Sequence, residues 1–189
     1  MATKTTHFEE SALCRRAARG DTQARHDLYL AHATGIMTLA TRMLSRPSCA
    51  EEVVQDTFMK AFDQLGRFEG KAKFSTWLRR IAINECLQRL RSPWHQRGQS
   101  FVEAQTPGQH TDEQIDLLRA LATLDPISRA VVWLHDVEGY THVEIGEMMD
   151  KTTSFSKSRL ARGHKTLRAA LNQHDEFSPC VPILNTSCQ

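Results

Sequence analysis

Apolar residues, with an occasional polar one, recur three or four positions apart along the chain. The strict alternation of apolar and polar residues that is typical of strands is scarce. In the first half this helical spacing produces three series: Leu28, His32, Ile36, Leu39 and Met43; Val54, Phe58, Ala61 and Leu65; and Phe74, Leu78 and Ile81, continuing toward Leu87 and Leu90. Turn signals at 20–21, 45–48 and 66–72 divide this half into about four helices. The pattern predicts an all-α protein.

The helical pattern is interrupted once over a long distance. Between residues 94 and 112 the sequence is polar, contains Gly98 and Pro107-Gly108, and lacks periodic apolar positions. We therefore expect two small helical domains, 1–93 and 113–172, joined by a flexible linker at 94–112. Beyond Asn172 two prolines and the loss of periodicity predict a flexible tail at 173–189.

The second domain has the pattern of a helix-turn-helix. Thr141 to Glu144 fits a capping box, in which each side chain accepts a hydrogen bond from the other residue's backbone N–H. A short helix should begin there and end near Asp150-Lys-Thr152. Thr153 or Ser154 can cap the following helix, whose buried stripe is Leu160, Gly163, Leu167 and Leu171.

Charge is polarised along the chain although the total is only +2. Residues 113–150 hold two basic and eight acidic residues, whereas residues 151–172 hold six basic residues and no carboxylate. A solvated helix face is the ordinary explanation for such a basic run. Here the run coincides with the second helix of the helix-turn-helix, and a helix that enters the major groove needs long basic side chains. The second domain is therefore expected to bind DNA.

The remaining composition argues against several other classes of protein. No apolar run approaches the roughly 20 residues that cross a bilayer, and the N-terminus lacks the apolar region of a signal peptide. We expect a cytoplasmic protein.

Cysteine and histidine spacing gives no sign of a metal or catalytic centre. The five cysteines form no C-x-x-C pair, and the histidines lack the H-E-x-x-H spacing. We expect no cofactor, no metal site and no enzymatic activity. One alternative stays open: Cys180 and Cys188 of the tail, with His174, could sense redox state or bind a metal.

Residues 50–91 resemble domain 2 of extracytoplasmic-function (ECF) sigma factors, the promoter-recognition subunits of bacterial RNA polymerase, and residues 137–168 resemble their domain 4. The matching elements are Glu51-Glu52-Val-Val-Gln-Asp56-Thr-Phe58, Ala61-Phe62, Arg67-Phe68-x-Gly70, Phe74-x-Thr-Trp77-Leu and Arg80-Ile-Ala-Ile-Asn84, followed by Val137-Glu-Gly-Tyr-Thr-His-Val-Glu-Ile and Lys157-Ser-Arg-Leu160-Ala-Arg162. Both sets occur in the expected order. The resemblance implies a sigma factor whose partners are core RNA polymerase, promoter DNA and an anti-sigma factor.

The resemblance also implies site residues. Domain 2 would bind the polymerase clamp through Gln55, Asp56 and Lys60, although a merely solvated helix would expose the same side chains. Domain 4 would read the −35 element in the major groove. Its implied DNA contacts are Lys157, Ser158, Ala161 and Arg162 toward bases, and Arg159 and Lys165 toward phosphates.

Opening of the −10 element needs cations for the single-strand backbone, a surface for unstacked bases and hydrogen-bonding groups for an extruded base. The loop at 66–75 and the helix after it supply the cations and one polar stripe: Lys71, Lys73, Arg80, Asn84, Gln88 and Arg91. We expect Asn84 to contact a flipped base because its amide offers both donors and an acceptor. Phe74 and Trp77 are candidates for base stacking, with a place in the core as the alternative.

The helix-turn-helix departs from the family pattern. It has Ser154-Phe155-Ser156 where Gly-Thr-Val is usual, Asp150 in place of a turn glycine, and Gly163 in place of an alanine. These changes suggest a second interpretation, in which a sigma-like module sequesters an anti-sigma factor and never initiates transcription. The six cations at 151–172 argue against it, because a protein decoy gains little from them.

Overall fold

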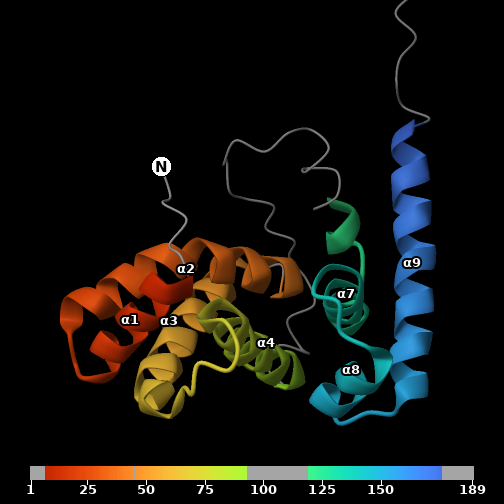
Figure 1. Cartoon of the computed structure of the whole chain (residues 1–189). Helices are drawn as coiled ribbons and strands as arrows, with labels where there is room; N and C mark the ends of the chain where they lie inside the picture. Colours follow the sequence, from red (N-terminus) through yellow and green to blue (C-terminus); the bar gives the residue numbers. More distant parts are fainter. Residues whose placement is uncertain (1–6, 45, 93–118, 176–189) are drawn as a thin grey trace, which may run out of the picture.

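The computed structural model describes residues 7–44, 46–92 and 119–175, and its described secondary structure is entirely helical (Figure 1). The first unit consists of α1 (His7–Ala18), α2 (Thr22–Leu44), α3 (Pro47–Gln64), the 3-10 turn η1 (Leu65–Arg67) and α4 (Phe74–Arg91). The second consists of α7 (Pro126–Val132), the π-helical segment η2 (Trp133–Val137), α8 (His142–Met149) and α9 (Thr153–Asp175). The all-α fold with a helix-turn-helix in the second half is confirmed. No described helix has the length and hydropathy of a membrane span.

Helices α2, α3 and α4 bury most of the stripe that the periodicity of each predicts. Leu28 and Leu39 of α2, Phe58 of α3 and Leu78 of α4 are all at most 3% exposed. Because α2 packs against both α3 and α4, these side chains share one core. Such a core fixes which face of α4 remains at the surface.

The second unit begins with a buried guanidinium. Arg129 of α7 is 5% exposed and donates hydrogen bonds to the carbonyl oxygens of Leu121 and Leu124, each at 2.8 Å. Desolvation lowers the pKa of Arg129 to about 10, so it stays charged at neutral pH. The side chain thereby ties the turn at 119–124 to α7, whose own start is capped by the Asp125 carboxylate.

The helix-turn-helix forms largely as its sequence predicts, but the predicted buried stripe of α9 is wrong at Leu171, which is 41% exposed. The capping box at Thr141 and Glu144 is present, and Asp150 adopts the left-handed conformation, with φ of 53°. Aspartate is one of the few residues besides glycine that enter this region readily, so the turn survives without the glycine. The predicted cap of α9 is wrong by one residue: the Thr152 hydroxyl accepts from the Phe155 N–H, at 3.2 Å, and the helix starts at Thr153.

The two units touch each other. α2 contacts α7, and α4 contacts both α7 and α8 (Figure 1). The predicted linker at 94–112 and tail residues 176–189 lie outside the described residues. Residues 173–175 were predicted to belong to the flexible tail but form the last turn of α9.

Gly163 occupies a position where a larger residue does not fit. A Cβ atom there would lie 2.6 Å from Cγ2 of Val132, so α9 packs closely on α7 at this point. Gly35 of α2, in contrast, has open space around it. The glycine that the sequence alone marks as a loss of helix propensity is thus required by packing.

We predict that Gly163→Ala destabilises the protein by about 1–3 kcal/mol, because the clash with a stiff valine outweighs the gain in helix propensity. Gly35→Ala is the matched control and should stabilise the protein by about 0.5–1 kcal/mol. Urea unfolding followed by circular dichroism measures both. Equal stabilisation by the two substitutions would contradict the packing at Gly163.

Candidate nucleic-acid interface

The exposed face of α9 carries the residues predicted for the −35 element. Five of them lie on one side of the helix and are exposed: Lys157, Ser158, Ala161, Arg162 and Lys165. Ser156, Leu160 and Gly163 on the opposite side are buried. A helix anchored in this way presents a continuous donor-rich surface that fits the major groove, where base edges offer acceptors.

Arg159 differs from the other predicted contacts on α9. Its guanidinium pairs with Asp125 at 3.2 Å and lies over the Phe155 ring, 5.2 Å from the centroid. This cation is therefore engaged in holding α9 to the start of α7. A phosphate contact by Arg159 would have to compete with that ion pair.

The unusual Ser156 is explained by a side chain on α8. Ser156 is fully buried, and its hydroxyl lies 3.0 Å from Nδ1 of His142. The His142 ring in turn stacks on His135, with centroids 4.6 Å apart. A valine at 156 could not form this hydrogen bond, so the departure from the family pattern is matched by a polar contact that orients the two helices of the motif.

Sequence reasoning missed the role of Asp136 in this region. Its carboxylate lies 2.7 Å from Nε2 of His164 and 2.9 Å from Nδ1 of His135. Burial acts to raise the pKa of Asp136, but the hydrogen bonds from His164 and His135 outweigh it and hold the pKa below its usual value. The contact joins η2 to the middle of α9. Among the described residues no group of three potential ligands could hold a metal ion.

The polar stripe predicted on α4 is present at the surface. Arg80, Asn84, Gln88 and Arg91 are exposed on one side of the helix, while Trp77 on the same side is half-buried. Lys71 and Lys73 of the preceding loop are also exposed, and Lys71 pairs with Glu69. These groups form a cationic and hydrogen-bonding surface next to one aromatic ring, which suits a single strand.

Phe74 does not belong to this surface. It is 1% exposed and packs against His32, Phe68 and Trp77. Phe74 was a candidate for base stacking, but the structure places its ring in the core. We therefore correct its assignment to a core residue. Its position at the start of α4 fixes the direction in which the helix leaves the loop.

The three residues predicted to bind polymerase have different surroundings. Gln55 is exposed, whereas the Asp56 carboxylate pairs with Arg89 at 2.5 Å and the Lys60 ammonium pairs with Glu85 at 2.6 Å. These two ion pairs join α3 to α4. The sequence gives no sign of them, because 33 and 25 positions separate the partners.

Comparison with known proteins decides the family of the chain. Residues 28–96 match the family model described as Sigma-70 region 2, and residues 114–167 match Sigma-70, region 4. The chain is 31% identical to RNA polymerase sigma factor CarQ of Myxococcus xanthus over 82% of its own length and 92% of that protein. It is 31% identical to ECF RNA polymerase sigma factor SigM of Mycobacterium tuberculosis over 80% of its length and 79% of that protein. The chain belongs to the ECF sigma factors.

A solved structure supports the same assignment. The sigma factor RpoE of Bartonella quintana, crystallised with the anti-sigma factor NepR, matches with a TM-score of 0.57 and 26% identity over 78% of this chain and 96% of that one. The function of this sigma factor is therefore to direct core RNA polymerase to promoters. The two exposed basic faces occur in the two regions that the family models match.

The described cysteines of this sigma factor are poor candidates for redox sensing. Cys14, Cys49 and Cys86 are buried free thiols. Burial raises the pKa of Cys86 to about 12 and that of Cys14 to about 11. Cys180 and Cys188, which carry the redox hypothesis, lie outside the described residues.

We predict that Cys86 resists alkylation by iodoacetamide near pH 8 in the folded protein, because only roughly one thiol in ten thousand is then ionised and the site is closed to solvent. In concentrated guanidinium chloride the same cysteine should react fully. Mass spectrometry of tryptic peptides measures the labelling. Rapid modification of Cys86 in the native protein would show that the core around α4 opens.

Proposed function

We propose that the stripe on α4 contacts the −10 element and that the exposed face of α9 reads the −35 element. The observation that carries this proposal is the occurrence of two separate exposed faces, each rich in donors and anchored by a buried opposite face. On α9 the base-reading residues are Lys157, Ser158, Ala161 and Arg162, with Lys165 toward the backbone. On α4 the proposed DNA contacts are Trp77, Arg80, Asn84, Gln88 and Arg91, with Lys71 and Lys73 in the loop, and Asn84 contacts the extruded base.

The polymerase-binding surface lies on α3 in this proposal. Gln55 is free to contact the clamp, whereas Asp56 and Lys60 also hold α3 against α4 through their ion pairs. Substitution of Asp56 would therefore both destabilise the packing of α3 on α4 and weaken the contact with the polymerase clamp. We propose that the factor performs no chemistry itself and acts inside the cell, where the polymerase is.

We also propose that an anti-sigma factor regulates the protein. The support is the solved complex of the related RpoE with NepR, a protein named as an anti-sigma factor. A module that only sequesters such a partner would not need an intact donor-rich face on α9. Transcription by a reconstituted holoenzyme separates the two possibilities.

The first test is transcript mapping with core RNA polymerase, this factor and genomic DNA as template. We predict that defined start sites appear and that Arg162→Ala lowers their use roughly tenfold, because a bidentate contact of arginine with guanine contributes about 1–3 kcal/mol. Arg19→Ala, which removes the same charge from an exposed position in the turn after α1, is the matched control and should change little. If Arg162→Ala and Arg19→Ala have the same effect, α9 does not read the promoter.

The second test concerns Asn84. We predict that Asn84→Ala lowers transcription by roughly tenfold while binding to core polymerase and the footprint at the −35 element stay unchanged, because only the capture of an extruded base is lost. Electrophoretic mobility shift with core polymerase and permanganate probing of open thymines distinguish the steps. Normal melting by the Asn84→Ala factor would place the base pocket elsewhere.

A further inference from the structure

One nearly buried carboxylate takes part in the contact between the two units, beside the packing of α2 on α7. Glu138, at the end of η2, has an 8% exposed side chain. Its Oε2 accepts from Nε of Arg79 on α4 at 2.9 Å, a second bond joins Nη2 of Arg79 to Oε1, and Nε1 of Trp133 donates to the same oxygen at 3.1 Å. A bidentate pair of this kind is among the stronger charge-assisted contacts.

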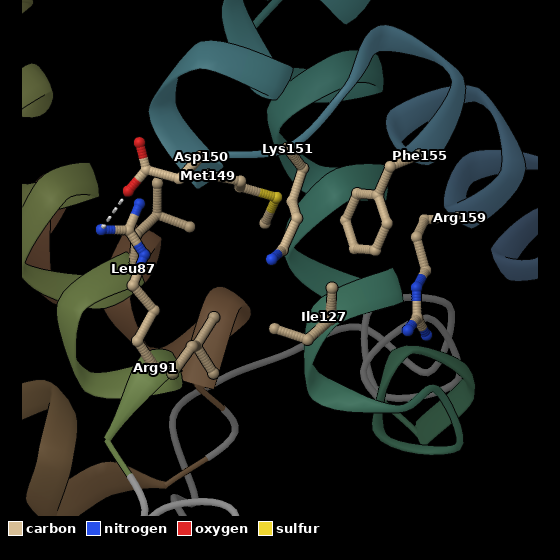
Figure 2. A pocket seen from close by; sticks show the side chains of 9 residues that line it. Leu87, Arg91, Ile127, Met149, Asp150, Lys151, Phe155 and Arg159 are labelled. Carbon is tan, nitrogen blue, oxygen red and sulfur yellow. Dashed lines mark ion pairs between the residues drawn. The ribbon is translucent and has the colours of Figure 1, made fainter.

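A second ion pair lies at the other end of α4. Arg91 donates to the backbone carbonyl of Met148 and lies 3.6 Å from the Asp150 carboxylate (Figure 2). Asp150 is the residue that forms the left-handed turn of the helix-turn-helix. The two carboxylates belong to the acidic segment 113–150, and both contact arginines of α4.

These contacts bring the two proposed DNA-reading helices together. Leu87 and Leu90 of α4 line one pocket of about 420 Å³ with Phe155 at the start of α9 (Figure 2). The −10 and −35 elements, by their names, are about 25 base pairs apart, which is roughly 85 Å of duplex at about 3.4 Å per base pair. Helices of 18 and 23 residues are about 27 and 35 Å long, so α4 and α9 cannot span that length while they line one pocket.

The contacts also occupy part of the −10 surface. Arg91 belongs to the polar stripe of α4 and is taken up by Met148 and Asp150. Arg80 of the same stripe lies close enough to Glu144 of α8 to contribute, after the Thr141 hydrogen bonds, to a lowered pKa of that carboxyl. Two arginines of the stripe thus interact with carboxylates of the second unit, which would compete with DNA phosphates for them.

We propose that Glu138 and Asp150 form an ion-pair latch with Arg79 and Arg91 that keeps the free sigma factor closed, and that the latch must open before both promoter elements can be bound. This inference rests on the proposed assignment of α4 and α9. The Arg91–Asp150 pair is largely exposed and the Arg79–Glu138 pair is not. The Arg79–Glu138 pair should therefore contribute most of the stability of the closed form.

The test uses the full chain with Glu138→Gln and Asp150→Asn combined. Asparagine tolerates the left-handed turn at 150, and glutamine keeps the shape of residue 138, so both substitutions remove charge with little change in structure. The matched control is Glu147→Gln with Asp63→Asn, two exposed carboxylates that are outside the latch. Small-angle X-ray scattering reports closure, and fluorescence polarisation reports binding to core RNA polymerase.

We expect the latch variant to have a larger radius of gyration than the wild type and the control in about 0.1 M salt. In about 1 M salt the wild type should expand only slightly, because screening weakens the exposed Arg91–Asp150 pair and affects the nearly buried Arg79–Glu138 pair much less. The variant should bind core polymerase roughly fivefold more tightly, since a smaller share of the population has to be opened.

Two results would overturn the latch. One is an unchanged radius of gyration in the variant, which would show that these ion pairs do not hold the units together. The other is an expanded variant that binds polymerase with wild-type affinity, which would show that closure does not oppose binding. Failure of the wild type, variant and control alike to bind polymerase would instead contradict the proposed function, and the latch with it.

Discussion

The two helices that are proposed to contact DNA, α4 and α9, each have one buried face and one exposed face, and this constraint organises both the fold and the site. In α4 the buried face contains Leu78 and Ile83, so Asn84 and Gln88 have to lie at the surface. In α9 the buried Leu160 and Gly163 leave Ala161 and Arg162 exposed. The small size of each unit gives a helix only one core to pack against, and the opposite face is available for DNA.

Local features of the fold could be predicted because their causes are local. The capping box at Thr141, the break at Asp125-Pro126 and the direction of the polar stripe on α4 follow from residues within a few positions of one another. The same holds for the donor-rich face of α9. Propensity, capping and periodicity act over one or two turns of helix, so the sequence displays them directly.

The features that could not be predicted join distant parts of the chain. The contact of Ser156 with His142 and the close packing of Gly163 on Val132 depend on how helices cross. Each of these residues departs from what its local pattern suggests, and each has a partner on another helix. The ion pairs of Asp56 and Lys60 belong to the same class, since both partners lie on α4.

The central claim is that two anchored helices, α4 and α9, contact two separate stretches of the promoter when the sigma factor is bound to polymerase. Site-specific crosslinking tests it most directly, with a photoreactive amino acid at Gln88 on α4 or at Ser158 on α9, two exposed positions. The account predicts that the two probes crosslink to DNA sites about 25 base pairs apart upstream of one start site. Crosslinks from both probes to the same site, or from neither, would contradict it.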